Sequence, residues 1–336
     1  MSTSCQSQIS RYRSVSLSML ACVLALFARI ASAQVADEKP AIEPDRVTYG
    51  PASTIRFRVG AEVSATQGAA RDVHLFVAVP LDCPEQEVKS VDEDFTSEVT
   101  NVEYRMIQGG ARQMMITIAR LADGAKAHAL VTFEVSTRPI LPPEKTDDLK
   151  IPEHPPAGVR QFLGGSPFIE VQHHAIKALA KEIASGIETS ATDWQKIEAI
   201  YDYVLDHIEY VEGDDKTALE TLHDKQADCE GRSALFIALC RANKIPARMV
   251  WVEHHAYPEF YLENAQGEGA WYPCESAGTR AFGEMPLART ILQKGDNFRV
   301  PEKKEHVRYV SHYGASLPVN GSGKPSVLFV QDQVGK

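Results

Sequence analysis

Three residues that together could cleave an amide bond follow one another in the second half of the chain. Cys229 stands in the stretch Asp228-Cys229-Glu230-Gly231-Arg232, His255 follows 26 residues later, and Glu275 follows after a further 20 residues. A cysteine thiolate is a good nucleophile, an imidazole can accept and return a proton, and a carboxylate can orient the imidazole and fix its tautomer. Cys229, His255 and Glu275 are therefore the candidate catalytic residues.

The surroundings of Cys229 determine how readily its thiol can ionise. Asp228 is a good N-cap, which places Cys229 at the first position of a helix, where unpaired backbone amides and the helix dipole favour negative charge. Asp228 and Glu230 oppose this effect because nearby carboxylates disfavour a second negative charge. A protonated His255 would favour an ion pair. We expect an acyl thioester on Cys229, with its own backbone amide as one oxyanion donor.

The helix that begins at Cys229 is predicted to be the centre of its domain. The run from Ala234 to Cys240 is apolar on every side, which is typical of a helix buried all round, and makes Cys240 a core residue. Apolar stripes predict two earlier helices over residues 176–183 and 193–208, and a short helix covers 218–222. Strands are predicted over residues 248–252, 256–262 and 270–274. Helices followed by antiparallel strands indicate an α+β domain.

The first half of the chain has a different periodicity. Apolar and polar residues alternate within 55–59, 73–79, 102–106, 114–118 and 131–135, which predicts an antiparallel β-sandwich. We expect this β-sandwich-like domain to span residues 34–137. A proline-rich linker follows over 138–166, then the catalytic domain over 167–312. The C-terminal tail over 313–336 has a possible final strand at 326–331.

Residues 1–33 read as a secretory signal peptide. Arg11 and Arg13 precede an apolar run from Val15 to Ala28, and Ala31-Ser32-Ala33 supplies small residues at a cleavage site. A membrane anchor is the alternative, but this run is shorter than the roughly 20 residues that a spanning helix needs. We therefore expect an exported protein, periplasmic or extracellular, with no stable membrane insertion after signal removal.

Charge and cysteine content limit the other function classes. Removal of the signal peptide takes away three arginines and no acid, so the net charge goes from −10 to −13, which disfavours nucleic acid as a partner. Cys83, Cys240 and Cys274 accompany Cys229 in the mature chain; Cys83 is the first candidate for any disulfide, and Cys274 for redox control of Cys229.

Metal and cofactor sites are not expected. Zinc held by Cys229, His254, His255 and Glu259 is the metal alternative, but neither a CxxC nor an HExxH spacing is present. His254 is expected to be a surface histidine. A basic run late in the chain is expected to be a solvated face; it consists of Lys294, Arg299, Lys303, Lys304 and Arg308.

An ordered set of segments resembles the transglutaminase-like superfamily of papain-fold cysteine enzymes, as a bacterial-type exported member with an N-terminal β-domain. The resemblance extends over residues 168–275. It includes the helix from Trp194 to Tyr210, Asp228-Cys229-Glu230, Ile245-Pro246-Ala247-Arg248, His255-Ala256-Tyr257 and Trp271-Tyr272-Pro273-Cys274-Glu275.

The resemblance implies a transglutaminase-like core, with a central helix packed on an antiparallel sheet. It also implies that Cys229 is the nucleophile, His255 the general base and acid, and Glu275 the third member of a triad. Two features depart from the family: Glu275 replaces an aspartate, and Pro258 interrupts a strand, which predicts a sheet edge or bulge beside the site.

Two functions are consistent with these features. The first is an exported transglutaminase-like cysteine enzyme, a protease, amidase or protein-glutamine acyltransferase, that acts on protein or peptide substrates by peptide hydrolysis or acyl transfer and needs no cofactor. The second is a non-catalytic scaffold that binds peptide or glycan on a degenerate form of the same fold. The intact cysteine and histidine favour the first.

Overall fold

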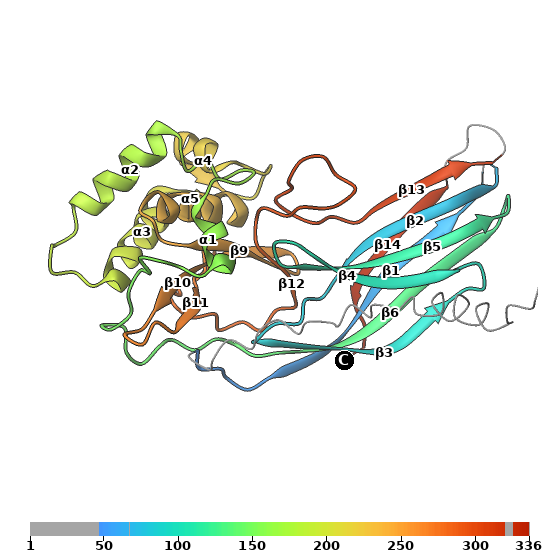
Figure 1. The fold of residues 1–336 in the computed structure, drawn as a ribbon, viewed down its shortest axis with the longest axis horizontal. Helices are drawn as coiled ribbons and strands as arrows, with labels where there is room; N and C mark the ends of the chain where they lie inside the picture. Colours follow the sequence, from blue (N-terminus) through green and yellow to red (C-terminus); the bar gives the residue numbers. More distant parts are fainter. Residues whose placement is uncertain (1–46, 67, 320–324, 336) are drawn as a thin grey trace, which may run out of the picture. The chain divides into compact units, whose positions relative to one another are not determined.

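The computed structural model describes residues 47–66, 68–319 and 325–335. The fold combines helices and sheets, with the helices gathered around one part of a long sheet and a β-sandwich formed by the other part (Figure 1). The predicted signal peptide, and residues 34–46 of the predicted β-domain, lie outside the described residues. The predicted α+β fold class, with an all-β region before the helices, is confirmed.

One antiparallel sheet runs through both parts of the molecule. Its strand order is β11-β10-β9-β12-β5-β2-β13, and β4 pairs additionally with β5. The strands are β2 (Ala70–Val79), β4 (Asn101–Ile107), β5 (Ala111–Leu121), β9 (Ala247–Val252), β10 (His255–Glu263), β11 (Gly269–Pro273), β12 (Ile291–Lys294) and β13 (Tyr313–Pro318). Because β12 pairs with β9 on one side and with β5 on the other, it joins the helical part to the sandwich.

A second sheet completes the sandwich. It has the order β14-β1-β6-β3, and it consists of β1 (Ser53–Ser64), β3 (Gln86–Phe95), β6 (Lys126–Thr137) and β14 (Ser326–Gln333). Alternate residues of both sheets point inward and form one apolar core, which includes Phe57, Val59, Leu75, Met114 and Phe133. The alternation read from the sequence therefore reflects burial of one face of each strand.

The helices surround one central helix. They are α1 (Ala157–Arg160), the 3-10 helix η1 (Gln161–Leu163), α2 (His174–Ser185), α3 (Asp193–His207), α4 (Ala218–Asp224) and α5 (Cys229–Ala242), with the short parallel pair β7 (Glu209–Tyr210) and β8 (Gln226–Ala227) between them. Helix α5 packs against β9 and β10 on one side and against α2, α3 and α4 on the other. Its residues from Gly231 to Arg241 are buried, as the all-round apolar pattern predicts.

Two segments depart from their expected roles. The proline-rich segment 138–166 was expected to be a linker, but Ile140 bridges to Met285 and Lys150 bridges to Glu263, and the segment ends in α1 and η1. The segment 313–336 was expected to be a tail with a possible final strand at 326–331; β14 forms that strand and pairs with β1, whereas β13, which was not expected, pairs with β2. These backbone pairings join residues far apart in the sequence, which local patterns do not reveal.

Pro258 does not mark a sheet edge or a bulge, contrary to expectation. Strand β10 lies between β9 and β11, and its register with β9 runs without a shift through the Pro258–Met249 pair. The carbonyl of Pro258 accepts a hydrogen bond from the Cys274 amide just beyond the end of β11. The missing amide of Pro258 is therefore tolerated where the neighbouring ladder ends.

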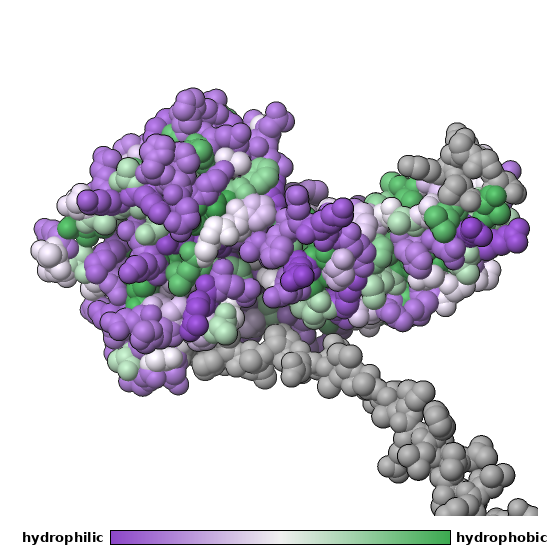
Figure 2. Space-filling model, turned by 45° about the horizontal axis from the view of Figure 1, so that its top comes forward, coloured by the Kyte–Doolittle hydropathy of each residue, from purple (hydrophilic) through white to green (hydrophobic). Residues whose placement is uncertain are grey.

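The surface visible in Figure 2 is mostly hydrophilic, with apolar residues in small scattered groups. None of the helices formed by the described residues has the length and apolar character that crossing a bilayer requires.

Candidate active site

Cys229 lies at the first position of α5, as predicted. The Asp228 carboxylate caps the helix by accepting a hydrogen bond from the Gly231 amide at 2.9 Å. Gly231 is needed for close packing, because a Cβ at this position would lie 2.7 Å from both the Ala227 Cβ and the Thr221 hydroxyl of the adjoining α4–β8 segment. The sequence Asp-Cys-Glu-Gly therefore starts the helix and lets α4 approach it.

The main chain at Cys229 is held from two sides. The Ser233 hydroxyl donates a hydrogen bond to the Cys229 carbonyl at 2.6 Å, and the Ser276 hydroxyl approaches the same carbonyl at 3.2 Å. The two hydroxyls lie 2.7 Å apart; because Ser233 uses its single proton on the carbonyl, Ser276 is the donor between them and Ser233 the acceptor. Ser276 adjoins Glu275, which ties the start of α5 to the segment that carries the candidate third catalytic residue.

His255 is the first residue of β10, and its imidazole contacts the Glu275 carboxylate. A two-residue turn, Glu253-His254, connects β9 to β10, and His254 adopts a φ of 56°, which few residues other than glycine adopt. The turn brings the His255 Nε2 atom to 2.8 Å from Glu275 Oε1. The His254 side chain is 92% exposed, consistent with its expected surface position.

The Glu275 carboxylate is itself fixed in place. The Ala277 amide donates to Glu275 Oε1 at 2.9 Å, and the Tyr201 hydroxyl donates to the Glu275 backbone carbonyl at 2.7 Å. The extra methylene of glutamate, relative to the aspartate of the family, does not prevent contact with the imidazole. Because Glu275 engages Nε2, the Nδ1 atom of His255 remains for proton exchange with a substrate or thiol.

The electrostatic environment opposes ionisation of the candidate nucleophile. Burial, together with the carboxylates of Asp228, Glu230 and Glu275, raises the pKa of Cys229 to about 11, although a hydrogen bond from the Ala256 amide lowers it. The opposition expected from the two flanking carboxylates is therefore present, and burial is the larger effect. Ala256 follows His255 on β10, so this strand supplies both an imidazole and a backbone donor near the helix terminus.

Tyr210 also belongs to this region, although no motif or periodicity in the sequence marks it. In the β7–β8 pair, Tyr210 lies opposite Ala227, two residues before Cys229. Burial raises the pKa of the Tyr210 hydroxyl, and so do the nearby Cys229, Glu212, Asp228 and Glu275. The phenol therefore stays protonated and can donate a hydrogen bond at neutral pH. Its place in the site depends on a two-residue strand pair, for which the sequence offers little signal.

A pocket of about 460 Å³ opens beside His255. Its lining includes Asp215, Glu230, Trp251, Glu253, Arg308 and Tyr309. Arg308 was expected to lie on a solvated basic face, but its side chain is only 17% exposed and pairs with Asp215 and Glu230. Lys294, expected on the same face, is also buried, and it pairs with Glu85 and Glu259. All four acidic partners are distant in the sequence from these two basic residues, so local composition could not identify them.

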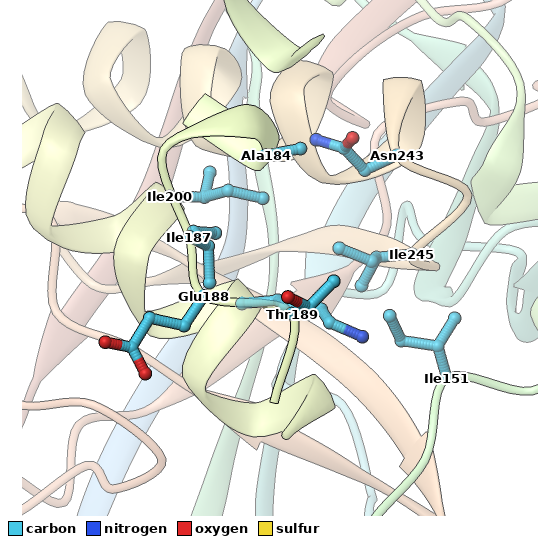
Figure 3. Close-up of a pocket in the computed structure, with 9 residues that line it drawn as sticks. Ile151, Ala184, Ile187, Glu188, Thr189, Ile200, Asn243 and Ile245 are labelled. Carbon is cyan, nitrogen blue, oxygen red and sulfur yellow. The ribbon is translucent and has the colours of Figure 1, made fainter. Parts of the chain in front are cut away.

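A second pocket, of about 400 Å³, lies away from the candidate catalytic residues. Ile187 and Ile200 line it from the α2–α3 segment, with Ile245 and Asn243 from the residues after α5 (Figure 3). The pocket contains neither a candidate nucleophile nor a histidine. It does not bear on the chemistry of Cys229.

The metal alternative is not supported among the described residues. Glu259 is turned to Arg248 and Lys294, and His254 points into solvent, so they do not join Cys229 and His255 in one ligand set. The four described cysteines are free thiols. Cys240 and Cys274 lie in the core around α5, as expected for Cys240.

Known proteins were compared with the sequence and the structure. Residues 177–276 match the Transglutaminase-like superfamily, and a search of curated proteins found no match. A solved structure named a "putative cysteine protease" from Cytophaga hutchinsonii is similar with a TM-score of 0.54 and 18% identity, covering 86% of this chain and 94% of that one. At this identity, the similarity concerns the fold.

Two further structures have a TM-score of 0.27 each. The first is named a "putative protease" from Parabacteroides distasonis; it is 13% identical, and the similarity covers 72% of this chain and 48% of that one. The second is the periplasmic domain of TgpA from Pseudomonas aeruginosa; it is 15% identical, and the similarity covers 66% of this chain and 89% of that one. The family match spans α2 to the residue after Glu275. Residues 177–276, less than a third of the chain, thus match the transglutaminase-like superfamily.

Proposed function

We propose that this protein is an exported cysteine enzyme that acts on amide bonds of proteins or peptides through Cys229, His255 and Glu275. The observation that carries the proposal is the 2.8 Å contact between His255 Nε2 and Glu275 Oε1, next to a cysteine at the first position of a buried helix. A histidine oriented by a carboxylate at a cysteine is the arrangement that nucleophilic acyl transfer requires.

In the proposed reaction, the proton is transferred through His255 Nδ1, the ring nitrogen that does not contact Glu275. His255 Nδ1 accepts the thiol proton as Cys229 Sγ attacks the carbonyl carbon, and the same proton then passes to the leaving amine as the C–N bond breaks. Water or a second amine then attacks the thioester carbonyl and gives its proton to Nδ1. The S–C bond breaks, and Nδ1 returns the proton to the departing Cys229 Sγ, which restores the starting state. Glu275 holds the tautomer in which Nε2 carries a proton, and it stabilises the imidazolium.

The negative oxygen of the tetrahedral intermediate needs hydrogen-bond donors. The Cys229 backbone amide at the start of α5 is one proposed donor, because amides in the first turn of a helix have no partner within the helix. The Tyr210 hydroxyl is the second. Its position opposite Ala227 and its retained proton support this role.

One experiment distinguishes the two reactions that a thioester allows. The mature protein is incubated with a glutamine-rich protein and a fluorescent amine and, in parallel, with a mixture of peptides whose cleavage is followed by mass spectrometry. Amine incorporation without cleavage assigns a transferase, and cleavage without incorporation assigns a protease or amidase. Activity that persists in Cys229→Ala would reject the proposal.

The raised pKa of Cys229 favours a second candidate, a non-catalytic scaffold that binds peptide or glycan. In this case ligands bind without turnover, and Cys229→Ala and His255→Ala leave their affinity unchanged. Specific alkylation of Cys229 near neutral pH, suppressed in His255→Ala, would instead favour the enzyme.

A further inference from the structure

A late segment of the chain reaches the candidate nucleophile through an ion-pair cluster. Arg308 lies in the connection between β12 and β13, where it is 79 residues beyond Cys229. One of its terminal nitrogens, NH2, lies 2.6 Å from Glu230 Oε2 and 2.5 Å from Asp215 Oδ2. Glu230 is the residue directly after Cys229, so Arg308 contacts the immediate neighbour of the thiol.

The Arg308 guanidinium is held in place by aromatic rings as well as by carboxylates. It lies 4.2 Å from the centre of the Phe168 ring and 5.5 Å from the centre of the Trp251 ring, and these cation–π contacts add to the ion pairs. The guanidinium is always charged, and its planar donor group can engage two carboxylates at once. A positive charge is therefore fixed in a half-buried position where the surrounding side chains are largely acidic.

The other charges near Cys229 are mostly negative; the exception is Arg232, whose buried guanidinium donates to the Leu205 carbonyl and interacts with Tyr210 and Glu275. Asp228 caps the start of α5, Glu230 lies on α5, Glu275 follows β11, and Asp215 lies in the segment before α4. Tyr210 on β7 is neutral, and His255 on β10 contacts Glu275. Glu230 is itself partly buried, which raises its pKa, while Arg308 lowers it. Without Arg308, two carboxylates would lack their partner at the entrance to the site.

We propose that Arg308 is a positioning residue for the candidate nucleophile: it holds the Glu230 carboxylate in an ion pair and offsets its charge, so that Cys229 can form a thiolate. The inference rests on the proposed function only in treating this thiolate as catalytic. The segment between β12 and β13, which connects the helical part to the sandwich, would then contribute Arg308 to the candidate active site.

The test measures the thiolate directly and does not require a substrate. Alkylation of each cysteine of the mature protein by iodoacetamide is followed by peptide mass spectrometry between pH 7 and pH 10.5. At pH 8 we expect Arg308→Met to slow alkylation of Cys229 by a factor on the order of ten, the effect of losing one nearby charge in a partly buried site. Arg308→Lys keeps the charge, so its rate should stay within about threefold of wild type.

The double variant Arg308→Met/Glu230→Gln separates charge from structure. Removing the unpaired carboxylate should return the alkylation rate to within about threefold of wild type, whereas a purely structural role of Arg308 predicts no recovery. Arg58→Met, which removes an arginine paired with Asp94 in the sandwich, is the matched control. The buried thiols of Cys240 and Cys274 become reactive if a variant unfolds.

If Arg308→Met does not fold, Glu230→Gln alone still decides the matter. With Arg308 intact and one carboxylate neutralised, alkylation of Cys229 at pH 8 should be about threefold faster than in wild type or more. An unchanged or slower rate would overturn the inference, as would a wild-type rate in folded Arg308→Met. Should these shifts occur in a protein that turns over no amide substrate, the proposed function fails while the role of Arg308 stands.

Discussion

Strand β10 contributes to two charged clusters that differ in their balance. Around Glu259, two carboxylates meet two cations: Lys294 pairs with Glu85 and Glu259, and Arg248 pairs with Glu259. Around Cys229, four carboxylates surround two arginines, Arg308 and Arg232, and one histidine. The first cluster is nearly neutral and almost fully buried, whereas the second carries an excess of negative charge and opens to a pocket.

The difference in charge balance agrees with a structural role for the Glu259 cluster and with the proposed catalytic role for the Cys229 cluster. A buried charge is tolerated when its partners neutralise it, because desolvation of an unpaired charge is costly. At the Glu259 cluster, each buried charge has an opposite charge as partner, and burial raises the pKa of the neighbouring Cys83 thiol well above its usual range, so this thiol stays protonated. At Cys229 the charges are incompletely balanced around a thiol and an imidazole, which is the pattern expected where protonation states must change during a reaction. Substitutions in the two clusters should therefore affect different quantities.

The largest effect is expected at Glu275. Glu275→Gln replaces the acceptor at His255 Nε2 by an amide, which no longer stabilises the imidazolium or selects the required tautomer. We expect kcat to fall by about 10³ to 10⁴ while the free energy of unfolding changes little. The measurement is the rate of amide cleavage or amine incorporation, compared with urea unfolding of the same variant.

Glu275→Asp serves as the control for Glu275→Gln. It retains a carboxylate and restores the residue of the family, so its kcat should lie well above that of Glu275→Gln. A Glu275→Gln enzyme with activity within tenfold of wild type would remove Glu275 from the proposed mechanism.

The next effect is expected on stability, in the balanced cluster. Lys294→Met leaves Glu85 and Glu259 buried with only Arg248 as a cation, and we expect a loss of about 3 to 5 kcal/mol in the free energy of unfolding. Urea unfolding followed by fluorescence measures it. Alkylation of Cys229 should remain near wild type in the fraction that is folded.

A matched arginine at the surface provides the contrast. Arg280 also pairs with two carboxylates, Glu198 and Asp202, but its side chain is 48% exposed. Arg280→Met should therefore lower the free energy of unfolding by less than about 1 kcal/mol. Equal losses in Lys294→Met and Arg280→Met would show that burial does not distinguish the two clusters.

Sequence patterns predicted the elements that depend on local periodicity. The apolar run predicted helix α5, and the residue type of Asp228 predicted its N-cap. The alternation of apolar and polar residues predicted the strands around Phe57 and Phe133. Strand β3 was missed because it is a sheet edge: after Gln86 nearly all of its residues are exposed and several are acidic, so no alternation is visible. Its pairing with β6 supplies the backbone hydrogen bonds that the pattern does not reveal.

Long-range contacts limited the prediction of the site. His255 and Glu275 were selected by residue type and order, and the fold brings them into contact. Arg308 and Lys294 were assigned to a solvated face because a run of basic residues does not specify distant acidic partners. Tyr210 depends on a strand pair of two residues. Residues that act from another part of the chain were thus the ones that the sequence concealed.

A moderate effect is expected at Tyr210, on activity alone. Tyr210→Phe removes one donor to the proposed oxyanion, so kcat should fall by about 10²-fold with little change in KM. Alkylation of Cys229 by iodoacetamide forms no oxyanion, so its rate should stay near that of wild type. Tyr203→Phe, on α3, is the control. A parallel loss of alkylation and turnover in Tyr210→Phe would assign Tyr210 to the nucleophile rather than to the oxyanion.

The smallest effect is expected at Asp228, where stability and reactivity conflict. The carboxylate caps α5, yet it also raises the pKa of Cys229. Asp228→Asn keeps a good cap and removes the charge, so alkylation of Cys229 at pH 8 should become about threefold faster while the free energy of unfolding stays within about 0.5 kcal/mol. Asp228→Ala should give a similar gain in rate but lose about 1 kcal/mol of stability. If Asp228→Asn leaves the alkylation rate unchanged, the excess of negative charge does not control the thiol, and burial alone sets its pKa.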